Sequence, residues 1–468
     1  MKALELFFNP RGVAVVGASS RPGSVGYVIV DQLRKRFRGK VYPVNPKYSE
    51  ILGLKCYKSV EEVPDPVDLA VIAVRADLVP NVMESVGKRG IKAAIVVSGG
   101  FAEVGPEGEE RQRRLVEISR KYGIRVVGPN CIGVLDNHSG IDTFFLPEDR
   151  LKRPPKGTIS IASQSGALLS MWIDWMAMKG MGLSKALSYG NKVDIDEVDA
   201  LDYFIDDPNT HVILMYIEGL KPGRGQEFIK MARKAIAAGK PVIVLKGGRT
   251  RKGFAAAASH TAAMAAGYEI YRAVFRQVGI VEVDEMEEMF DVAKAFTMLP
   301  LPRGDRVLIL TNAGGEGVLA TDFAERYGLN VVDMPKEVQE ELRKQLPPHV
   351  VVRNPIDLTG DTDDERYRIA LETVLKHGAV DSVVLIAPPH PPAMTGAVVK
   401  YARDCMDRYG VPIVAVVTGG VIAEEFARKF EEAGIPAYGS PERAVKALAA
   451  MVKFAKAKKK ASSSQSLS

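Results

Sequence analysis

The sequence predicts an α/β protein with three doubly wound parallel sheets. Short runs of β-branched residues alternate along the whole chain with amphipathic stretches of helical length, which is typical of parallel strands covered by helices. The length of 468 residues exceeds what one hydrophobic core usually holds. Proline-rich breaks at 152–156 and 299–303 each come just before a new strand, so we expect domain boundaries there.

These breaks divide the chain into expected domains at 1–150, 151–300 and 301–456, followed by a disordered tail at 457–468. Helices are expected to fill most of the intervals between strands. Ten segments are expected to form buried strands: Val13–Val16, Val41–Val44, Leu69–Val74, Ala93–Val97, Thr158–Ala162, Val212–Ile217, Pro241–Leu245, Arg306–Leu310, Ser382–Ala387 and Pro412–Val417.

Composition narrows the class of protein. The net charge of +6 is small beside 63 basic and 57 acidic residues, so nucleic-acid binding is not expected. No apolar run reaches the roughly 18 residues of a membrane span, and the N-terminus leads into a strand rather than a cleavable signal. Three cysteines far apart in sequence suggest neither disulfides nor a metal site. We therefore expect a cytoplasmic protein.

The second and third domains resemble copies of one unit. Thr158–Ala167 aligns with Arg306–Gly315, and each is a strand that enters a turn of small residues. Three later matches follow in the same order: His211–Ile217 with Asp381–Ala387, Gly239–Gly248 with Gly410–Gly420, and Gln277–Val281 with Glu432–Pro436. After its glycine pair the first copy continues into a basic, small-residue stretch with His260, whereas the second begins a charged helix at Val421. The scaffold is duplicated, but the histidine segment is not.

The first strand runs into a glycine-rich turn and then a helix, a layout in which main-chain N–H groups hold phosphates. The spacing is not that of a dinucleotide fingerprint, and Lys47 stands where such an enzyme has an acid for the ribose. CoA is therefore favoured over NAD, although a glycine turn used only for packing stays open. The candidate ligand residues are Gly17, Ala18, Ser19, Gly23 and Gly26 in the turn, with Asn45 and Lys47 after the second strand.

Two further turns of this domain come at strand ends, where ligands gather in a parallel sheet. They contain Ser98 and Gly99 in one turn and Asn130 in the other, and their small residues leave room for an extended thiol arm. Taken alone, each is equally compatible with an ordinary turn.

The start of a helix in each copy is a candidate anion site. Ser165, Gly166 and Ala167 open one helix, and Gly314 and Gly315 open the other. Helix N-termini without bulky side chains offer several unpaired N–H donors. Glycine placed there for tight packing is the alternative, and the duplicated placement favours the functional interpretation.

His260 is the candidate nucleophile. It lies in an expected mobile loop with three basic residues upstream, and an imidazole nitrogen can carry a labile phosphoryl group near neutral pH. Glu218 ends a buried strand, where its carboxylate could hold the other ring nitrogen. Its counterpart in the second copy is Pro388. A structural histidine and a solvated strand-end acid are the alternatives.

These motifs, in this order, resemble the acyl-CoA synthetase (NDP-forming) family, which includes succinyl-CoA synthetase and the archaeal ADP-forming acetyl-CoA synthetases. The resemblance extends from Val13 to about Val452. It is carried by the glycine turn and by Gly128–Cys131, Ser163–Gly166, Ile217–Gly219 and Ser259–Thr261.

The resemblance implies a Rossmann-like CoA-binding domain followed by two flavodoxin-like CoA-ligase domains. It implies that His260 is the phosphohistidine and Glu218 its partner. The two helix starts would then face phosphate, and Lys47 would meet the 3′-phosphate of CoA.

Members of the family also need an ATP-grasp module, which no part of this sequence resembles. The resemblance therefore implies the α subunit of a two-chain α2β2 enzyme whose β subunit binds most of ADP/ATP and Mg²⁺. The third domain resembles the arrangement of the archaeal acetate-type enzymes.

The expected reaction converts an acyl-CoA, ADP and phosphate to a small carboxylic acid, ATP and CoA through acyl phosphate and phosphohistidine. A catalytically silent CoA-binding regulatory subunit is the alternative, and an NAD oxidoreductase is disfavoured by Lys47.

Overall fold

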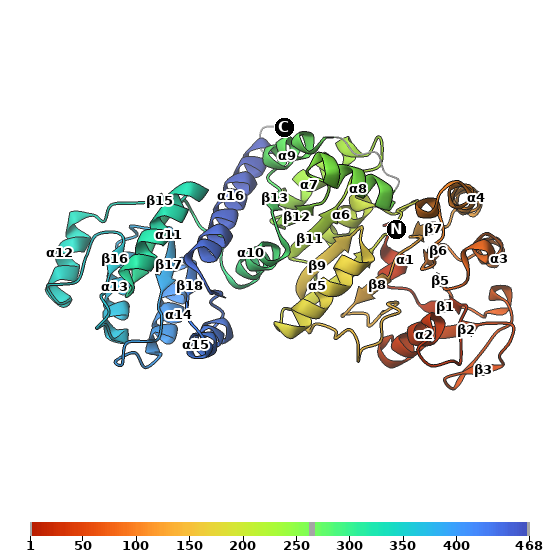
Figure 1. Ribbon diagram of the computed structural model, residues 1–468, viewed down its shortest axis with the longest axis horizontal. Coiled ribbons are helices and arrows are strands. Elements are labelled where there is room, and N and C mark those ends of the chain that lie inside the picture. Colours follow the sequence, from red (N-terminus) through yellow and green to blue (C-terminus); the bar gives the residue numbers. More distant parts are fainter. Residues whose placement is uncertain (1, 262–266, 466–468) are drawn as a thin grey trace. The chain divides into compact units, whose positions relative to one another are not determined.

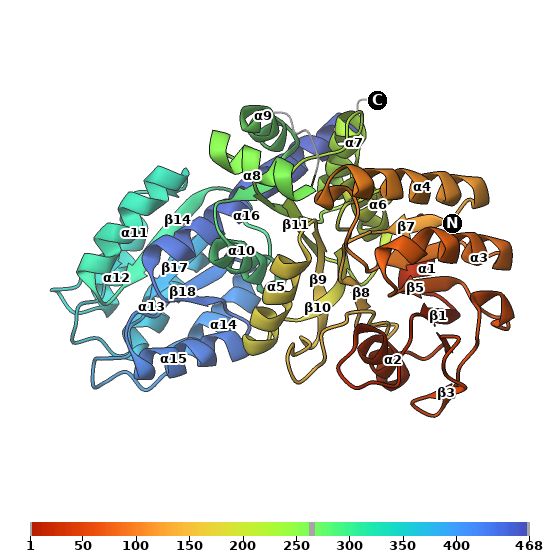
Figure 2. The same ribbon diagram turned by 45° about the vertical axis from the view of Figure 1, so that its right-hand side comes forward.

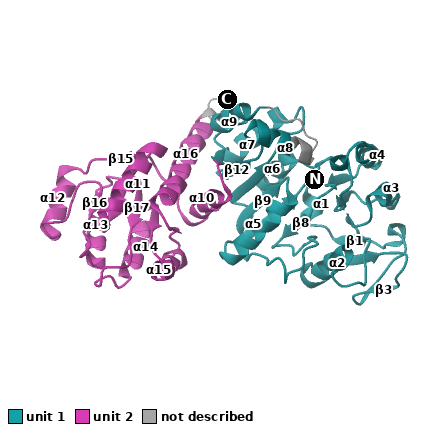
Figure 3. Cartoon of the chain, in the orientation of Figure 1, with its two compact units in different colours: residues 1–282 teal, residues 283–468 magenta. Residues whose placement is uncertain are grey.

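Figure 1 shows the computed structural model of the chain, which describes residues 2–261 and 267–465, with 258–261 and 464–465 described by their backbone alone. The chain forms two compact units, residues 1–282 and 283–468 (Figure 3). Among the described residues, none of the helices has the length and apolar character that crossing a bilayer requires.

The first sheet of unit 1 is parallel and has the order β2-β1-β5-β6-β7. Its strands are β1 (Gly12–Val16), β2 (Lys40–Val44), β5 (Leu69–Ile72), β6 (Ala93–Val96) and β7 (Arg125–Val127). A small antiparallel pair, β3 (Glu50–Ile51) and β4 (Leu54–Lys55), follows β2. The helices are α1 (Glu5–Phe8), α2 (Val25–Arg36), α3 (Val79–Arg89) and α4 (Pro106–Tyr122), with short 3-10 turns η1 (Val60–Glu62), η2 (Ala76–Leu78) and η3 (Ala102–Val104).

The second sheet has the order β13-β12-β11-β9-β10-β8 and is visible beside the first in Figure 2. Its strands are β8 (Gly133–Asp136), β9 (Lys156–Ser163), β10 (Leu183–Ser188), β11 (Val212–Ile217), β12 (Val242–Lys246) and β13 (Val281–Val283). The helices of this part are α5 (Gly166–Met178), α6 (Glu197–Asp206), α7 (Gly225–Ala237), α8 (Arg251–Thr261) and α9 (Tyr268–Val278). One hydrophobic core joins apolar side chains of both sheets.

The third sheet lies in unit 2 and has the order β15-β14-β17-β18-β19, with β16 also paired to β14. Its strands are β14 (Arg306–Thr311), β15 (Asn330–Val331), β16 (Ile356–Asp357), β17 (Ser382–Ile386), β18 (Ile413–Val416) and β19 (Ala437–Tyr438). The helices are α10 (Met286–Met298), α11 (Gly314–Tyr327), α12 (Lys336–Gln345), α13 (Asp364–Lys376), α14 (Ala397–Tyr409), α15 (Val421–Glu432) and α16 (Pro441–Gln465).

The predicted fold class is confirmed, and each expected strand is present. The order β19-β18-β17-β14-β15 repeats β13-β12-β11-β9-β10 strand for strand, as the aligned segments predicted. Most residues of these strands are buried, as is typical of parallel sheets covered by helices, whereas β15 is exposed at Asn330 and half-buried at Val331.

Two expectations about the chain's divisions need correction. The expected first domain ends at residue 150, yet β8 lies within it and pairs antiparallel with β10 of the second sheet. The expected disordered tail begins at residue 457, yet α16 continues to Gln465. Alanine and lysine favour a helix there. Within that last part of α16, the hydroxyl of Ser462 donates to the Lys458 carbonyl at 3.1 Å.

Strand β10 was missed because its sequence, Leu-Ser-Lys-Ala-Leu-Ser, carries polar residues that normally indicate exposure. The side chain of Lys185 is nonetheless buried, and its Nζ lies 3.0 Å from Asp207 and 3.5 Å from Asp136. Because both carboxylates come from elsewhere in the chain, no local pattern reveals this strand.

Candidate active site

The turn after β1 has no room for a side chain at two of its glycines. Gly17 has a φ of +90°, and a Cβ there would lie 2.3 Å from the carbonyl oxygen of Ala73. A Cβ on Gly26 would lie 2.1 Å from the carbonyl oxygen of Gly17. Gly23 has a φ of +76° and faces open space. A bare main chain at the start of a helix suits close approach by a phosphate group.

The end of β2 lies beside this turn. Asn45 Nδ2 donates to the Ala18 carbonyl at 2.7 Å, and Asn45 Oδ1 accepts from the Lys47 amide at 2.9 Å. The Lys47 side chain is exposed. Sequence reasoning missed Tyr48, whose phenol has its pKa lowered by the hydroxyls of Ser20 and Ser19 beside it. The candidate CoA residues from the two strands are thus adjacent.

The turns after β6 and β7 also meet. The Asn130 amide donates to the Ser98 carbonyl at 2.9 Å, and a Cβ on Gly99 would lie 3.2 Å from Asn130 Oδ1. Asn191, from the loop after β10, accepts from Asn130 Nδ2 at 3.4 Å and donates to Glu103 Oε2 at 2.6 Å. A loop of the second sheet therefore reaches the ligand edge of the first.

The turn before α5 is held by hydrogen bonds from a serine hydroxyl. Ser163 Oγ donates to the Ser165 carbonyl at 2.7 Å and accepts from the Ser165 amide at 3.2 Å. Ser165 Oγ then accepts from the Leu168 amide at 3.3 Å and so caps the helix. Gly166 and Ala167 are the first helical residues, where N–H groups have no acceptor within the helix. The turn presents donors suited to an anion.

Unit 2 repeats this turn at the start of α11. Thr311 Oγ1 donates to the Ala313 carbonyl at 3.0 Å and accepts from the Ala313 amide at 2.8 Å. Gly314 follows, and a Cβ there would lie 2.7 Å from Asp357 Oδ2, while Gly315 faces open space. Ala313, the N-cap residue of α11, makes no side-chain hydrogen bond to the helix, unlike Ser165 before α5. The two copies therefore share the hydrogen bonds of this turn, with Thr311 in the place of Ser163.

Glu218 directly follows β11 and is 6% exposed. Its amide donates to Gln164 Oε1 at 3.0 Å, and its carboxylate accepts from the Tyr216 hydroxyl at 3.2 Å. The strand end of β11 is thereby tied to the α5 turn. In the second copy, Asn312 takes the place of Gln164 and donates to the carbonyl of Pro388 at 3.3 Å.

Lys192 lies in the loop after β10 and is 4% exposed. Its Nζ contacts Glu197 Oε1 at 2.5 Å and Gln164 Oε1 at 3.3 Å, and it also donates to the carbonyl of Gly219. Sequence reasoning missed this residue because a lysine in a loop is normally exposed.

Lys246 ends β12 and is also buried. Its Nζ donates to the Glu218 carbonyl at 2.7 Å and to the carbonyl of Gly247. Burial lowers the pKa of Lys246 to about 8, although the nearby Glu218 carboxylate opposes that shift. No sequence signal marked this residue either.

The histidine segment is helical rather than a loop. Arg251–Thr261 forms α8, and the Thr250 carbonyl accepts from the Phe254 amide at 2.7 Å at its start. The expectation of a loop was wrong because a run of alanines favours a helix. Helix α8 contacts η3, next to the turn with Ser98 and Gly99. The backbone of His260 belongs to α8, and its side chain lies outside the described residues.

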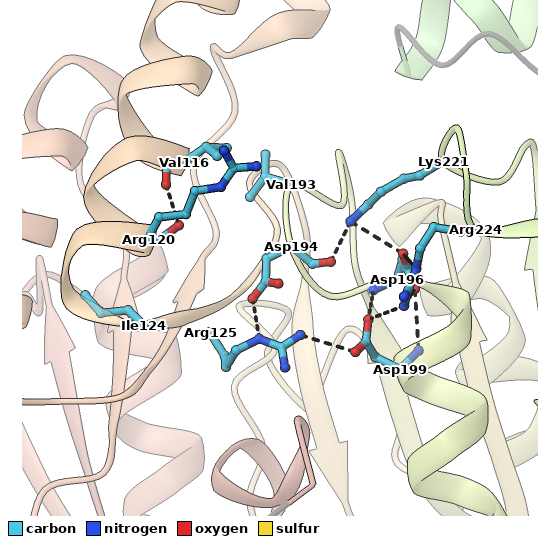
Figure 4. A pocket seen from close by; sticks show the side chains of 12 residues that line it. Val116, Arg120, Ile124, Arg125, Val193, Asp194, Asp196, Asp199, Lys221 and Arg224 are labelled. Atoms are coloured by element: carbon cyan, nitrogen blue, oxygen red, sulfur yellow. Dashed lines mark hydrogen bonds and ion pairs between the residues drawn. The ribbon is translucent and has the colours of Figure 1, made fainter. Parts of the chain in front are cut away.

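A cavity of about 440 Å³ lies elsewhere in unit 1, between α4 and the starts of α6 and α7 (Figure 4). Its charged side chains neutralise one another: Arg125 lies 2.7 Å from Asp194, and Arg224 lies 2.9 Å from Asp196. None of the candidate site residues lines it.

Comparison with known proteins agrees with this architecture. Three family descriptions match in series: a CoA binding domain at 11–137, a succinyl-CoA ligase like flavodoxin domain at 156–296 and a ligase-CoA domain at 307–462. The α subunit of acetate–CoA ligase [ADP-forming] I from Pyrococcus furiosus is 42% identical over 467 residues, which cover 98% of this chain and 99% of that relative. This chain belongs to the family of ADP-forming acetate–CoA ligase α subunits.

A solved family structure covers the same span. The acetyl-coenzyme A synthetase 1 of Candidatus Korarchaeum cryptofilum, in complex with phosphate and ADP, is 39% identical, with a TM-score of 0.91 and 98% of each chain covered. Acetate–CoA ligase [ADP-forming] I of Archaeoglobus fulgidus is 39% identical over 97% of this chain, but the match covers 64% of that longer family member.

Proposed function

We propose that the chain is the α subunit of an ADP-forming acyl-CoA synthetase that acts on acetyl-CoA or another small acyl-CoA. The proposal rests on one edge of the second sheet. There the capped turn before α5, Glu218 and the strand that leads to α8 come together. The carboxyl ends of β9, β11 and β12 lie side by side because these strands are parallel neighbours. The unit 2 copy keeps the turn but lacks the acid and the histidine segment. A silent regulatory subunit is not favoured, because the close relatives are ligases.

In the first step, phosphate attacks the thioester carbonyl, the C–S bond breaks, and CoA leaves with acyl phosphate remaining. The first-sheet edge suits CoA, since its glycine turn leaves the main chain bare and Lys47 adds a cation. The turns at Ser98, Gly99 and Asn130 are proposed to hold the thiol arm. Their contact with α8 through η3 supports transfer within unit 1.

In the second step, His260 attacks the phosphorus of acyl phosphate, and the carboxylate leaves as the free acid. We propose that the N–H groups of Gly166 and Ala167 hold the phosphoryl oxygens. The Nε2 of Gln164 supports this assignment, because it is buried and has no acceptor among the described residues. A buried donor without an acceptor costs about 1–3 kcal/mol, and a bound anion would supply one. The α11 turn at Gly314 and Gly315 is proposed as a second phosphate-binding helix start, by its likeness to α5.

In the third step, the phosphoryl group passes from His260 to ADP and gives ATP. We propose that an ATP-grasp β subunit binds the nucleotide and its Mg²⁺, in an α2β2 assembly in the cytoplasm. The α-subunit names of the relatives support a partner chain. The longer Archaeoglobus relative supports it too, because about a third of its length lies beyond the match.

Co-expression with such a partner tests the function. The complex is expected to form ATP from acetyl-CoA, ADP and phosphate, whereas each chain alone forms none. Release of CoA and formation of ATP are measured together, in equal amounts. Nicotinamide-dependent turnover, or CoA binding without ATP formation by the complex, would contradict the proposal.

Lys47→Met is expected to weaken CoA binding roughly tenfold, because one charge-assisted contact to the 3′-phosphate is lost. Binding of 3′-dephospho-CoA is expected to stay unchanged. Isothermal titration with both ligands measures the difference. Lys40→Met is the matched control, since Lys40 is exposed at the start of β2, the strand that precedes Lys47. Equal losses for both ligands would show that Lys47 does not meet that phosphate.

A further inference from the structure

Two buried lysines hold the backbone at Glu218 from opposite sides. In the order β12-β11-β9-β10, Lys246 is the last residue of β12, on one side of β11. Lys192 lies in the loop after β10, beyond β9 on the other side. Lys246 donates to the carbonyl of Glu218 at 2.7 Å, and Lys192 donates to the carbonyl of Gly219. Two consecutive main-chain carbonyls, those of Glu218 and Gly219, thus each accept a hydrogen bond from a buried ammonium group.

The same two lysines connect this backbone to both neighbouring parts of the candidate site. Lys192 also contacts Gln164 Oε1 at 3.3 Å, and the Glu218 amide donates to that same oxygen at 3.0 Å. Lys246 lies directly before the segment that leads to α8, and its carbonyl accepts from Arg249 Nε at 2.9 Å. A shift of either lysine would therefore move Glu218 relative to the α5 turn or to α8.

This arrangement is costly for stability. Removal of an ammonium group from water costs several kcal/mol unless its donors are well paired. Lys192 has one carboxylate partner, Glu197, whose second oxygen has no partner among the described residues. Lys246 donates to two main-chain carbonyls, those of Glu218 and Gly247, and burial lowers its pKa.

The duplicated scaffold shows that the fold itself does not require these lysines. The third sheet has the same strand order, yet no lysine is buried among the described residues of unit 2. Before its glycine pair the second copy has Thr418 where the first has Lys246, and it has Pro388 where the first has Glu218. Lys192 and Lys246 are therefore found in the copy that has Glu218, and the sheet alone does not explain their burial.

We propose that Lys192 and Lys246 are positioning residues that clamp the Glu218–Gly219 backbone between the α5 turn and the segment leading to α8. This inference rests on the proposed function. The clamp sets the position of the Glu218 carboxylate, the proposed partner of the phosphoryl carrier, and a displacement of about 1 Å at a reacting group can cost a hundredfold in rate.

The test uses Lys192→Met and Lys246→Met in the complex with the partner subunit. Lys185→Met is the matched control, because Lys185 is equally buried and ion-paired but lies on β10, with Asp207 and Asp136 as its partners. Acid-labile phosphate on His260 is followed in rapid-quench experiments with labelled ATP, and rates are expressed per folded molecule from the thermal unfolding of each variant.

The two clamp variants are expected to slow phosphorylation roughly tenfold to a hundredfold, with Lys192→Arg recovering part of the rate, whereas Lys185→Met loses stability but keeps the wild-type rate. Equal rates in all three methionine variants would overturn the clamp. If the clamp variants do not fold, Glu197→Gln removes the carboxylate partner of Lys192 without touching the proposed phosphate site, and it must slow the same step. Absence of phosphorylation in the wild-type complex would instead overturn the proposed function, so the two failures are distinguishable.

Discussion

Replacing His260 by alanine is expected to abolish both acid-labile phosphate incorporation and ATP formation by the complex. The imidazole is the proposed phosphoryl carrier, and alanine has no atom that can take its place. The label is supplied as γ-labelled ATP with the partner subunit, and acid and base stability of the product identify the P–N bond. Release of CoA from acetyl-CoA and phosphate is expected to persist for at most one turnover.

His377→Ala is the control for this experiment. His377 lies in unit 2, where its Nε2 contacts Glu341 at 2.8 Å on the surface. Full phosphorylation of the control together with loss in His260→Ala supports the assignment. Retained acid-labile phosphate in His260→Ala would show that another residue is the carrier.

The second largest effect is expected for Glu218→Gln, which should slow phosphorylation of His260 about a hundredfold or more. The amide keeps the size of the side chain and can still accept from Tyr216, but it cannot stabilise an imidazolium ring by charge. Single-turnover rates measure the loss, and thermal unfolding checks that the variant is folded.

Glu227→Gln serves as the matched control for Glu218→Gln. Glu227 lies in the first turn of α7 and is exposed, with Arg224 as its partner. A wild-type rate for Glu218→Gln, or an equal loss in both variants, would remove Glu218 from the proposed mechanism.

The fold was predictable from sequence where apolar runs are continuous. Val13–Val16 is buried along its whole length, and Val212–Ile217 is buried except at the half-buried Tyr216, so their continuous apolar pattern indicates a strand directly. The duplication was equally accessible, since alignment of Thr158–Ala167 with Arg306–Gly315 predicted the same strand-to-helix turn. Its hydrogen bonds from Ser163 and Thr311 are the same in the structure.

The site was predictable only where its residues follow strands in sequence. Ser165, Glu218 and Lys47 stand within three residues of the ends of expected strands, and parallel strands bring such residues to one edge. Lys192 and Asn191 could not be found, because strand β10 itself depends on ion pairs from distant residues. A buried charge is defined by its tertiary partners, which leave no local pattern.

The pairing of β8 with β10 restricts where the chain can be divided. A fragment that begins at residue 151 would retain β10 without its antiparallel neighbour, and an unpaired strand edge invites association with other chains. It would also lack Asp136, so buried Lys185 would keep a single carboxylate. Recombination or engineered exchange of the CoA-binding segment must therefore carry β8 along with the ligase sheet, with its junction before residue 133.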